Sequence, residues 1–356
     1  MEAAVILGAG FSKNSGIPIQ YEIPELLLRA PEKDQFEMAV TRVLEQFMRY
    51  IYGYEGKGTF PSLDDMFTCI DLSTNSGHHL GSRYSPMHLR AIRRLLVYRV
   101  FSVLHDYYKV DREVTEMIRL LLSSYSKIGF IVLNWDTVLE DYLRIISPNS
   151  NINYYNDGLQ WGQDQTEDAA PGFDLLKIHG SSNWVYCDNC RSLFYDLNNH
   201  ISNRKKAGLH EMDFMVLEEL EVLPLHIRKE LLNSESCQIC GDSVSSHIAT
   251  FSYRKSFRAN AFSNIWKKAE EILSTCRKWI FIGYSLPDAD YDFKHLLKIS
   301  QLKLGHVIEK KLSVEVVVLN SDSTIKKYSQ FFGNSLGNVY NGGVGEFLNK
   351  NYLFRQ

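Results

Sequence analysis

The stretch Val5-Ile6-Leu7-Gly8-Ala9-Gly10-Phe11-Ser12, near the start of the chain, joins a short apolar run to a glycine-rich turn. This order is typical of a buried strand that runs into a tight turn and then into a helix. Glycines let a backbone approach a pyrophosphate closely, and the amide groups of a helix start favour an anion. Lys13 occupies the place of the third glycine in the full dinucleotide-binding motif. The turn alone is therefore equally compatible with a purely structural role.

Similar apolar runs recur downstream, and each is followed by a polar residue or a glycine. We expect strands at 130–133, 175–178, 279–282 and 314–319, and helices at 35–53, 87–107, 111–124 and 288–302. This alternation predicts an α/β fold, a Rossmann-like doubly wound parallel sheet. Ligands of such sheets bind at the carboxyl ends of the strands. The residues that follow the strands therefore predict one site: Gly8, Asn134, His179, Gly283 and Asn320.

The composition argues against several classes of protein, namely disordered, nucleic-acid-binding, membrane-spanning and secreted chains. The chain has 356 residues, of which 45% are hydrophobic and 23% charged, and its formal net charge is −3. These values exclude a disordered chain and disfavour direct nucleic-acid binding. No segment approaches the ~20 apolar residues that cross a bilayer, and the first residues lack the features of a signal peptide. We therefore expect a soluble, cytoplasmic protein.

Four of the six cysteines form two Cys-x-x-Cys pairs, Cys187/Cys190 and Cys237/Cys240. In a reducing compartment such pairs are more often metal ligands than disulfides, and four thiolates suit a closed structural zinc site. The alternative is four thiols without a metal. We interpret Cys69 and Cys276 as ordinary buried thiols.

The same patterns predict the domain organisation. Residues 1–183 and 251–356 are expected to form the Rossmann-like domain, with a helical insertion at about 22–125. Residues 184–250 are expected to form a small cysteine-rich lobe, in which 209–232 is the one long periodic element.

Several short motifs together resemble the sirtuins (Sir2-type proteins), NAD-dependent enzymes on a Rossmann-type sheet. They occur in the family's order and extend over nearly the whole chain, with the two cysteine pairs where sirtuins insert a zinc lobe. The other matching segments are Gly8-Ala9-Gly10-Phe11-Ser12-Lys13-Asn14-Ser15-Gly16-Ile17-Pro18, Asn134-Trp135-Asp136, His179-Gly180, Gly283-Tyr284-Ser285-Leu286, Val318-Leu319-Asn320 and Gly342-Gly343-Val344-Gly345-Glu346.

The departures from the family are equally informative. Sirtuin deacylases continue the Gly-Ile-Pro element with Asp-Phe-Arg, whereas Pro18 is followed here by Ile19-Gln20-Tyr21. Trp135 replaces the usual Ile, and the region between Gly16 and Asn134 is long and divergent. In these respects the chain resembles the sirtuin-like effectors of bacterial anti-phage systems, such as the sirtuin-like subunit of sirtuin–HerA systems. That branch degrades NAD.

The resemblance implies a role for each matching residue. Asn134 would bind the ribose hydroxyls or order a water, His179 would act as general base or hydroxyl partner, and Asp136 would meet the nicotinamide carboxamide. The remaining implied contacts to NAD are Gly8, Ala9, Gly10, Ser12 and Ser285 around the phosphates, and Asn320 and Val344 beside the adenosine. Gly283 is also implied to bind NAD.

Structural explanations exist for several of these residues. Asn134 and Asp136 are compatible with a helix N-cap pair, and His179 with the end of a strand. We interpret Asp288 and Asp290 as the start of a helix rather than as catalytic acids, and Trp135 as a core residue.

The leading functional hypothesis is an NAD glycohydrolase that forms ADP-ribose and nicotinamide. The alternatives are an NAD-dependent protein deacylase and a subunit that binds NAD, or serves a structural purpose, without turnover. An unregulated NAD-degrading enzyme would kill its host. We therefore expect control by self-assembly into a homo-oligomer or by a partner such as a hexameric HerA-type ATPase.

Overall fold

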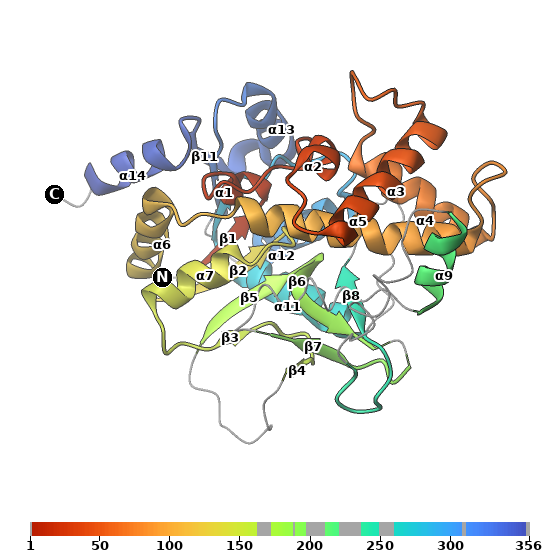
Figure 1. Cartoon of the computed structure of the whole chain (residues 1–356). Coiled ribbons are helices and arrows are strands. Elements are labelled where there is room, and N and C mark those ends of the chain that lie inside the picture. The colour runs from red at the N-terminus through yellow and green to blue at the C-terminus, as the bar shows by residue number, and fades with distance from the viewer. Residues whose placement is uncertain are drawn as a thin grey trace.

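A seven-stranded parallel sheet lies at the centre of the computed structural model, which describes residues 2–161, 172–187, 189–196, 211–220, 236–248, 260–307 and 311–353 (Figure 1). The strand order is β11-β10-β9-β1-β2-β5-β3, and each paired neighbour runs parallel. The strands are β1 (Glu2–Leu7), β2 (Lys127–Val132), β3 (Ile152–Asn153), β5 (Phe173–Lys177), β9 (Lys278–Ile282), β10 (Ser313–Val317) and β11 (Leu336–Tyr340).

The chain builds this sheet outward from β1, first through β2 and β5 and then, on the other side, through β9, β10 and β11. The doubly wound, Rossmann-like arrangement predicted from the apolar runs is confirmed. Residues 3–7 of β1 have no exposed surface, because helices cover both faces of the sheet. The switch in strand order falls between β1 and β9, so the glycine turn after β1 opens at the place where such sheets bind ligands.

The helices that surround the sheets follow the apolar periodicity closely. The expected helices at 35–53, 87–107 and 111–124 each agree within one residue at either end, and the one expected at 288–302 begins at Tyr291 and continues to Val307. Within the described residues the helices are α1 (Ala9–Lys13), α2 (Ile23–Arg29), α3 (Gln35–Tyr52), α4 (Leu63–Ser76), α5 (Pro86–Tyr107), α6 (Arg112–Ser124), α7 (Val138–Ile146), α9 (Glu211–Glu219), α11 (Asn260–Thr275), α12 (Tyr291–Val307), α13 (Asp322–Phe332), the 3-10 helix η1 (Gly333–Ser335) and α14 (Gly343–Leu353).

Helices α2 to α6 lie between β1 and β2 in the chain, and α3, α4 and α5 gather at the upper right of Figure 1. The starts of α3, α4, α5 and α6 are set by side-chain caps: Asp34, Ser62, Ser85 and Asp111 each accept a hydrogen bond from a backbone N–H three residues on. The central helix, α5, is buried along most of its length, so it can serve as the core on which the others pack.

A second, smaller sheet lies below the first in Figure 1, with the strand order β4-β7-β6-β8. Its strands are β4 (Leu159–Gln160), β6 (Gly180–Tyr186), β7 (Leu193–Tyr195) and β8 (Ser245–Ile248). Strand β6 begins directly after His179 and ends directly before Cys187. Much of the lobe expected at 184–250 lies outside the described residues. Of the long periodic element expected at 209–232, the described part contains α9.

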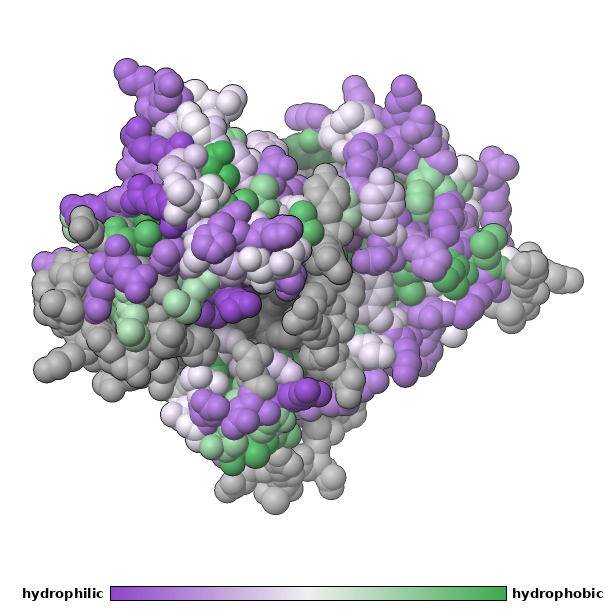
Figure 2. Space-filling view, turned by 90° about the vertical axis from the view of Figure 1, so that its right-hand side faces the viewer, coloured by the Kyte–Doolittle hydropathy of each residue, from purple (hydrophilic) through white to green (hydrophobic). Residues whose placement is uncertain are grey.

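Among the coloured residues on the face shown in Figure 2, most are hydrophilic, and the hydrophobic ones form small separate groups. Among the residues that the structure describes, no helix combines the length and apolar character needed to span a membrane.

Candidate functional site

The carboxyl ends of three neighbouring strands bring together the central residues of the predicted site. Ser12 lies on α1, which follows β1, while Asn134 follows β2 and His179 follows β5. These strands are adjacent and in register, with Leu7 opposite Val132 and Val132 opposite Lys177. Residues that are more than 160 positions apart in the sequence therefore meet at one edge of the sheet.

A hydrogen-bonded group forms around the buried Ser12 hydroxyl. Asn134 Nδ2 donates to Ser12 Oγ over 3.0 Å, and Ser12 also bonds to the Asp136 carboxyl group. Asp136 Oδ1 accepts the backbone N–H of Val138 at 3.2 Å, so the carboxyl group lies at the start of α7. Burial raises the pKa of Asp136, although nearby Lys177 and the two hydrogen bonds lower it in part.

A buried lysine fixes the loop that carries these residues. Lys177 Nζ donates to the backbone carbonyl of Asp136 and lies 3.4 Å from that of Asn134. The same ammonium group lies 3.3 Å from Glu140 Oε1, and Tyr154 donates its hydroxyl proton to that oxygen at 3.0 Å. The loop that carries Asn134 and Asp136 is therefore fixed by a buried, charged hydrogen-bond network.

His179 is 7% exposed, and both of its ring nitrogens face acceptors. Nδ1 lies 3.1 Å from the carbonyl oxygen of Leu133, which can only accept, so Nδ1 is the donor. Nε2 lies 3.4 Å from Asp290 Oδ1. Asp290 comes directly before α12, as expected of a residue at a helix start, but its carboxylate also points into the site. The sequence offers no signal that separates Asp290 from Asp288 in this respect.

The three glycines of the phosphate motifs pack against one another. Gly8 N–H donates to Ile282 O at 3.0 Å, and Gly10 N–H donates to Gly283 O at 2.8 Å. A Cβ atom on Gly10 would lie 2.7 Å from Gly283 Cα, and one on Gly283 would lie 2.1 Å from Phe11 N. Close packing of two strand ends therefore explains these glycines by itself. Their contact with phosphates remains a prediction.

The residues expected to contact adenosine form a second group at the far side of the same edge. The exposed Asn320, with φ at +47°, follows β10, and its backbone N–H donates to Asn341 O at 2.8 Å. Gly343 N–H donates to Val318 O at 2.9 Å, which places the buried Val344 beside this turn. Strand β9 and the loop with the exposed Ser285 lie between the two groups. Ala9 begins α1 next to Gly8.

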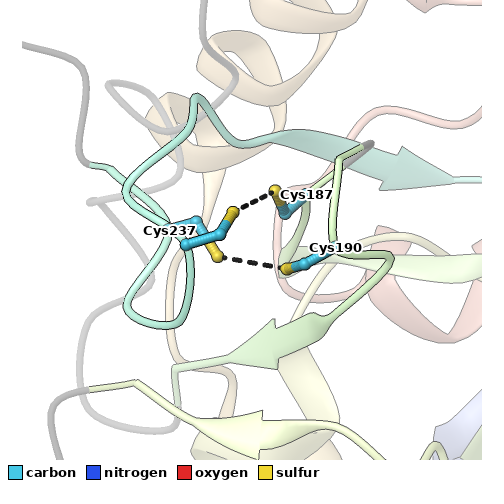
Figure 3. A group of neighbouring side chains, drawn as sticks. Cys187, Cys190 and Cys237 are labelled. Atoms are coloured by element: carbon cyan, nitrogen blue, oxygen red, sulfur yellow. Dashed lines mark hydrogen bonds between the residues drawn. The ribbon is translucent and has the colours of Figure 1, made fainter.

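The four paired cysteines cluster, as predicted (Figure 3). Their sulfur atoms lie within 4.8 Å of one another, and the Cys187–Cys240 and Cys190–Cys237 sulfurs are each 3.5 Å apart. A disulfide needs about 2.05 Å, whereas tetrahedral zinc with Zn–S bonds of about 2.3 Å separates its sulfurs by about 3.8 Å. The donor set and its spacing therefore fit zinc. Hydrogen bonding with the side chain and backbone of Ser192 lowers the pKa of Cys190 to about 6, which favours the thiolate that binds metal.

Trp135 and the two remaining cysteines are at least partly buried in the protein interior. Trp135 is 5% exposed and packs edge-on against Phe67 and Phe101, as expected of a core residue. Cys276 is buried, while Cys69 is partly buried.

Comparison with known proteins gives a loose likeness. No family model and no curated protein matches the sequence. A sirtuin structure concerned with substrate affinity is 14% identical, with a TM-score of 0.42 over 99% of this chain and 94% of the other. Sir2 bound to an inhibitor, 2′-O-acetyl-ADP-ribose and a deacetylated peptide is 13% identical, with a TM-score of 0.39 over 99% and 93%. An alanine variant of a Sir2 homologue with ADP-ribose is 14% identical, with a TM-score of 0.39 over 98% and 90%. The likeness is too loose to define a family.

Proposed function

We propose that this chain is an NAD glycohydrolase that cleaves NAD to ADP-ribose and nicotinamide. The observation that carries the proposal is the convergence of Ser12, Asn134, Asp136 and His179 at the switch-point edge of a doubly wound sheet. The sequence motifs that contain these residues resemble those of sirtuins, which supports NAD as the substrate.

The reaction needs little acid catalysis, because the leaving group is already a cationic pyridinium and does not have to be protonated. The bond between C1′ and the nicotinamide nitrogen breaks, and its electron pair neutralises that nitrogen. The ribose passes through an oxocarbenium-like state, which water attacks at C1′. The proton lost from this water needs an acceptor, and the positive charge on the sugar needs polar groups around it.

The residues of the site fit these needs. Asn134 would hold the ribose hydroxyls or the water, with its amide oriented by the bond to Ser12. His179 would receive the proton lost from the attacking water, the role of a general base. Asp136, with its raised pKa, would meet the nicotinamide carboxamide.

A protein deacylase is the competing assignment, because the clustered cysteines fit the zinc lobe of that group. The segment after Pro18 argues against it, since Ile19-Gln20-Tyr21 replaces the Asp-Phe-Arg of the deacylases. A subunit that binds NAD without turnover would leave the convergence of Asn134 and His179 without a purpose.

One incubation separates these possibilities. Purified protein is mixed with NAD, with and without an acetyl-lysine peptide, and the products are followed by chromatography. We expect ADP-ribose and nicotinamide without peptide, and a fall of both by at least about a hundredfold, to a residual rate, in His179→Ala and in Asn134→Ala. The exposed residues His79 and Asn149 provide controls, because His79→Ala and Asn149→Ala change the same residue types outside the site. O-acetyl-ADP-ribose formed only with peptide would establish the deacylase instead.

An enzyme that degrades NAD without control would kill its host, so its activity has to be regulated. We propose that the protein is a cytoplasmic effector of anti-phage defence that depletes NAD once it is activated by homo-oligomer assembly or by a HerA-type ATPase. Activity per chain should then rise with protein concentration or on addition of the partner. Full turnover by the monomer at every concentration would contradict this form of control.

A further inference from the structure

Asp290 is a buried carboxylate, 4% exposed, in the loop between β9 and α12. A buried charge is costly unless it is paired and hydrogen-bonded. Asp290 satisfies this requirement with two groups: Oδ1 lies 3.4 Å from His179 Nε2, and Oδ2 accepts the hydroxyl proton of Tyr284 at 2.8 Å.

Tyr284 is well suited to hold this carboxylate in place. Burial and the adjacent Asp290 charge raise the pKa of Tyr284 well above its ordinary value, so its hydroxyl keeps its proton and remains a donor. The backbone carbonyl of Tyr284 accepts the Tyr328 hydroxyl at 2.9 Å, and its ring packs against Phe281 and Phe293. The direction of the Asp290 carboxylate is thus set by packed aromatic residues.

We infer that Asp290 is a positioning residue for His179 and that it stabilises the charge that His179 gains during NAD cleavage. The inference rests on the proposed function. At 3.4 Å the contact is longer than an ordinary N–H···O hydrogen bond, so the carboxylate acts on the ring mainly through its charge. Leu133 O holds Nδ1, and Asp290 lies beside the nitrogen that receives the proton.

Atoms and charge balance in this step. The oxygen of water bonds to C1′ while the C1′–nitrogen bond breaks with its electron pair on nicotinamide. The proton of that water moves to His179 Nε2, and the imidazolium then lies beside the Asp290 carboxylate until the proton passes to solvent. The products are ADP-ribose, nicotinamide and one proton.

The structural alternative is that Asp290 serves only to begin α12, since its backbone carbonyl accepts Lys294 N–H at 3.1 Å. The substitution Asp290→Asn distinguishes the two, because asparagine is as good at helix starts as aspartate but carries no charge. Asp288→Asn is the matched control, since Asp288 lies two residues earlier with a side chain that is 80% exposed.

The first measurement is a double-mutant cycle with His179→Ala, scored by nicotinamide release. Asp290→Asn should lower kcat by about a hundredfold while KM changes little, because a positioned proton acceptor contributes on this order. Asp290→Asn should not lower kcat further in the His179→Ala background. Asp288→Asn should leave kcat unchanged both in the unaltered protein and in His179→Ala. An equal loss in both backgrounds, or unchanged kcat, would overturn the inference.

The second measurement does not need activity, so it separates failure of this inference from failure of the proposed function. In protein with isotope-labelled histidine, the His179 ring signals are identified by their absence in His179→Ala. We expect the Nε2 signal at neutral pH to move in Asp290→Asn and to stay in place in Asp288→Asn. If Asp290→Asn does not fold, Tyr284→Phe takes its place and should move the signal in the same direction by less. An unmoved Nε2 signal would overturn the inference whatever the enzyme does to NAD.

Discussion

Lys177 Nζ lies 3.3 Å from Glu140 Oε1, and the two side chains are 0% and 1% exposed. Lys177 ends β5 two residues before His179, and its ammonium group also bonds to the loop that carries Asn134 and Asp136. One buried cation therefore joins the backbone segments from which the two predicted catalytic residues, Asn134 and His179, project.

Lys177→Met should lower the free energy of unfolding by about 3–5 kcal/mol, because it leaves the Glu140 carboxylate buried and unpaired. Adding Glu140→Gln should restore a large part of the loss, since the amide oxygen can still accept the Tyr154 hydroxyl. Denaturant unfolding measures both variants. The exposed pair of Lys13 and Glu22 is the control, and Lys13→Met should change stability by less than about 1 kcal/mol. Equal stability of the single and double variants would show that the pair does not act as a unit.

Asp136→Asn should make the protein more stable and less active. Because burial raises the pKa of Asp136 in the folded state, ionising this carboxyl group weakens the folded state as the pH rises through that pKa. The gain in melting temperature of Asp136→Asn should therefore be absent at acid pH, below the usual range for aspartate, and should grow toward neutral pH. NAD cleavage should fall by about tenfold or more, because a polar contact to the substrate is lost. A gain that shrank with rising pH would contradict the assigned direction.

The close packing of Gly10 against Gly283 gives a prediction about stability alone. Gly283 has φ at +64°, and a Cβ atom there would meet the backbone of Gly10 and Phe11, so Gly283→Ala should destabilise the protein by more than about 1 kcal/mol. A Cβ atom on Gly305, in α12, would have nothing within 4 Å, and Gly305→Ala should stabilise by about 0.5–1 kcal/mol. Thermal unfolding of the two variants side by side tests this contrast. A neutral Gly283→Ala would mean that the two strand ends are less tightly packed than these distances indicate.

The cysteine cluster should hold about one zinc ion per chain in freshly purified protein. Cys237→Ser should lose the metal and lower the melting temperature, and a strong chelator should do the same to the unaltered protein. Cys69→Ser should keep the bound metal and the melting temperature, because Cys69 lies outside the cluster. Metal analysis that gave no zinc in the unaltered protein would leave four free thiols as the correct assignment.

The sequence predicted those parts of the molecule that depend on local patterns. Mostly apolar runs identified β1, β2, β5, β9 and β10, because strands buried on both faces are predominantly apolar. The two Cys-x-x-Cys pairs identified the cluster, because four sulfurs at that spacing have few other uses.

The contributions of Asp290 and Lys177 depend on contacts between distant segments, which no local pattern encodes. Asp290 looks like any aspartate before a helix, and its approach to His179 arises from the packing of Tyr284 against its neighbours. Lys177 is the last residue of a mostly apolar strand, and its contact with Glu140, which also accepts the Tyr154 hydroxyl, becomes visible only once the chain is folded.

The mutual packing of Gly8, Gly10 and Gly283 changes how tolerance to substitution should be interpreted in this molecule. A saturation library would find these three positions intolerant whether or not any nucleotide is bound, because the backbone itself excludes a side chain. Ala9 carries a side chain already, and Ser12 has a polar one directed at Asn134. A selection that compares folding with NAD loss would therefore draw its information about the ligand from Ala9 and Ser12, while the three glycines would report on the packing of the backbone.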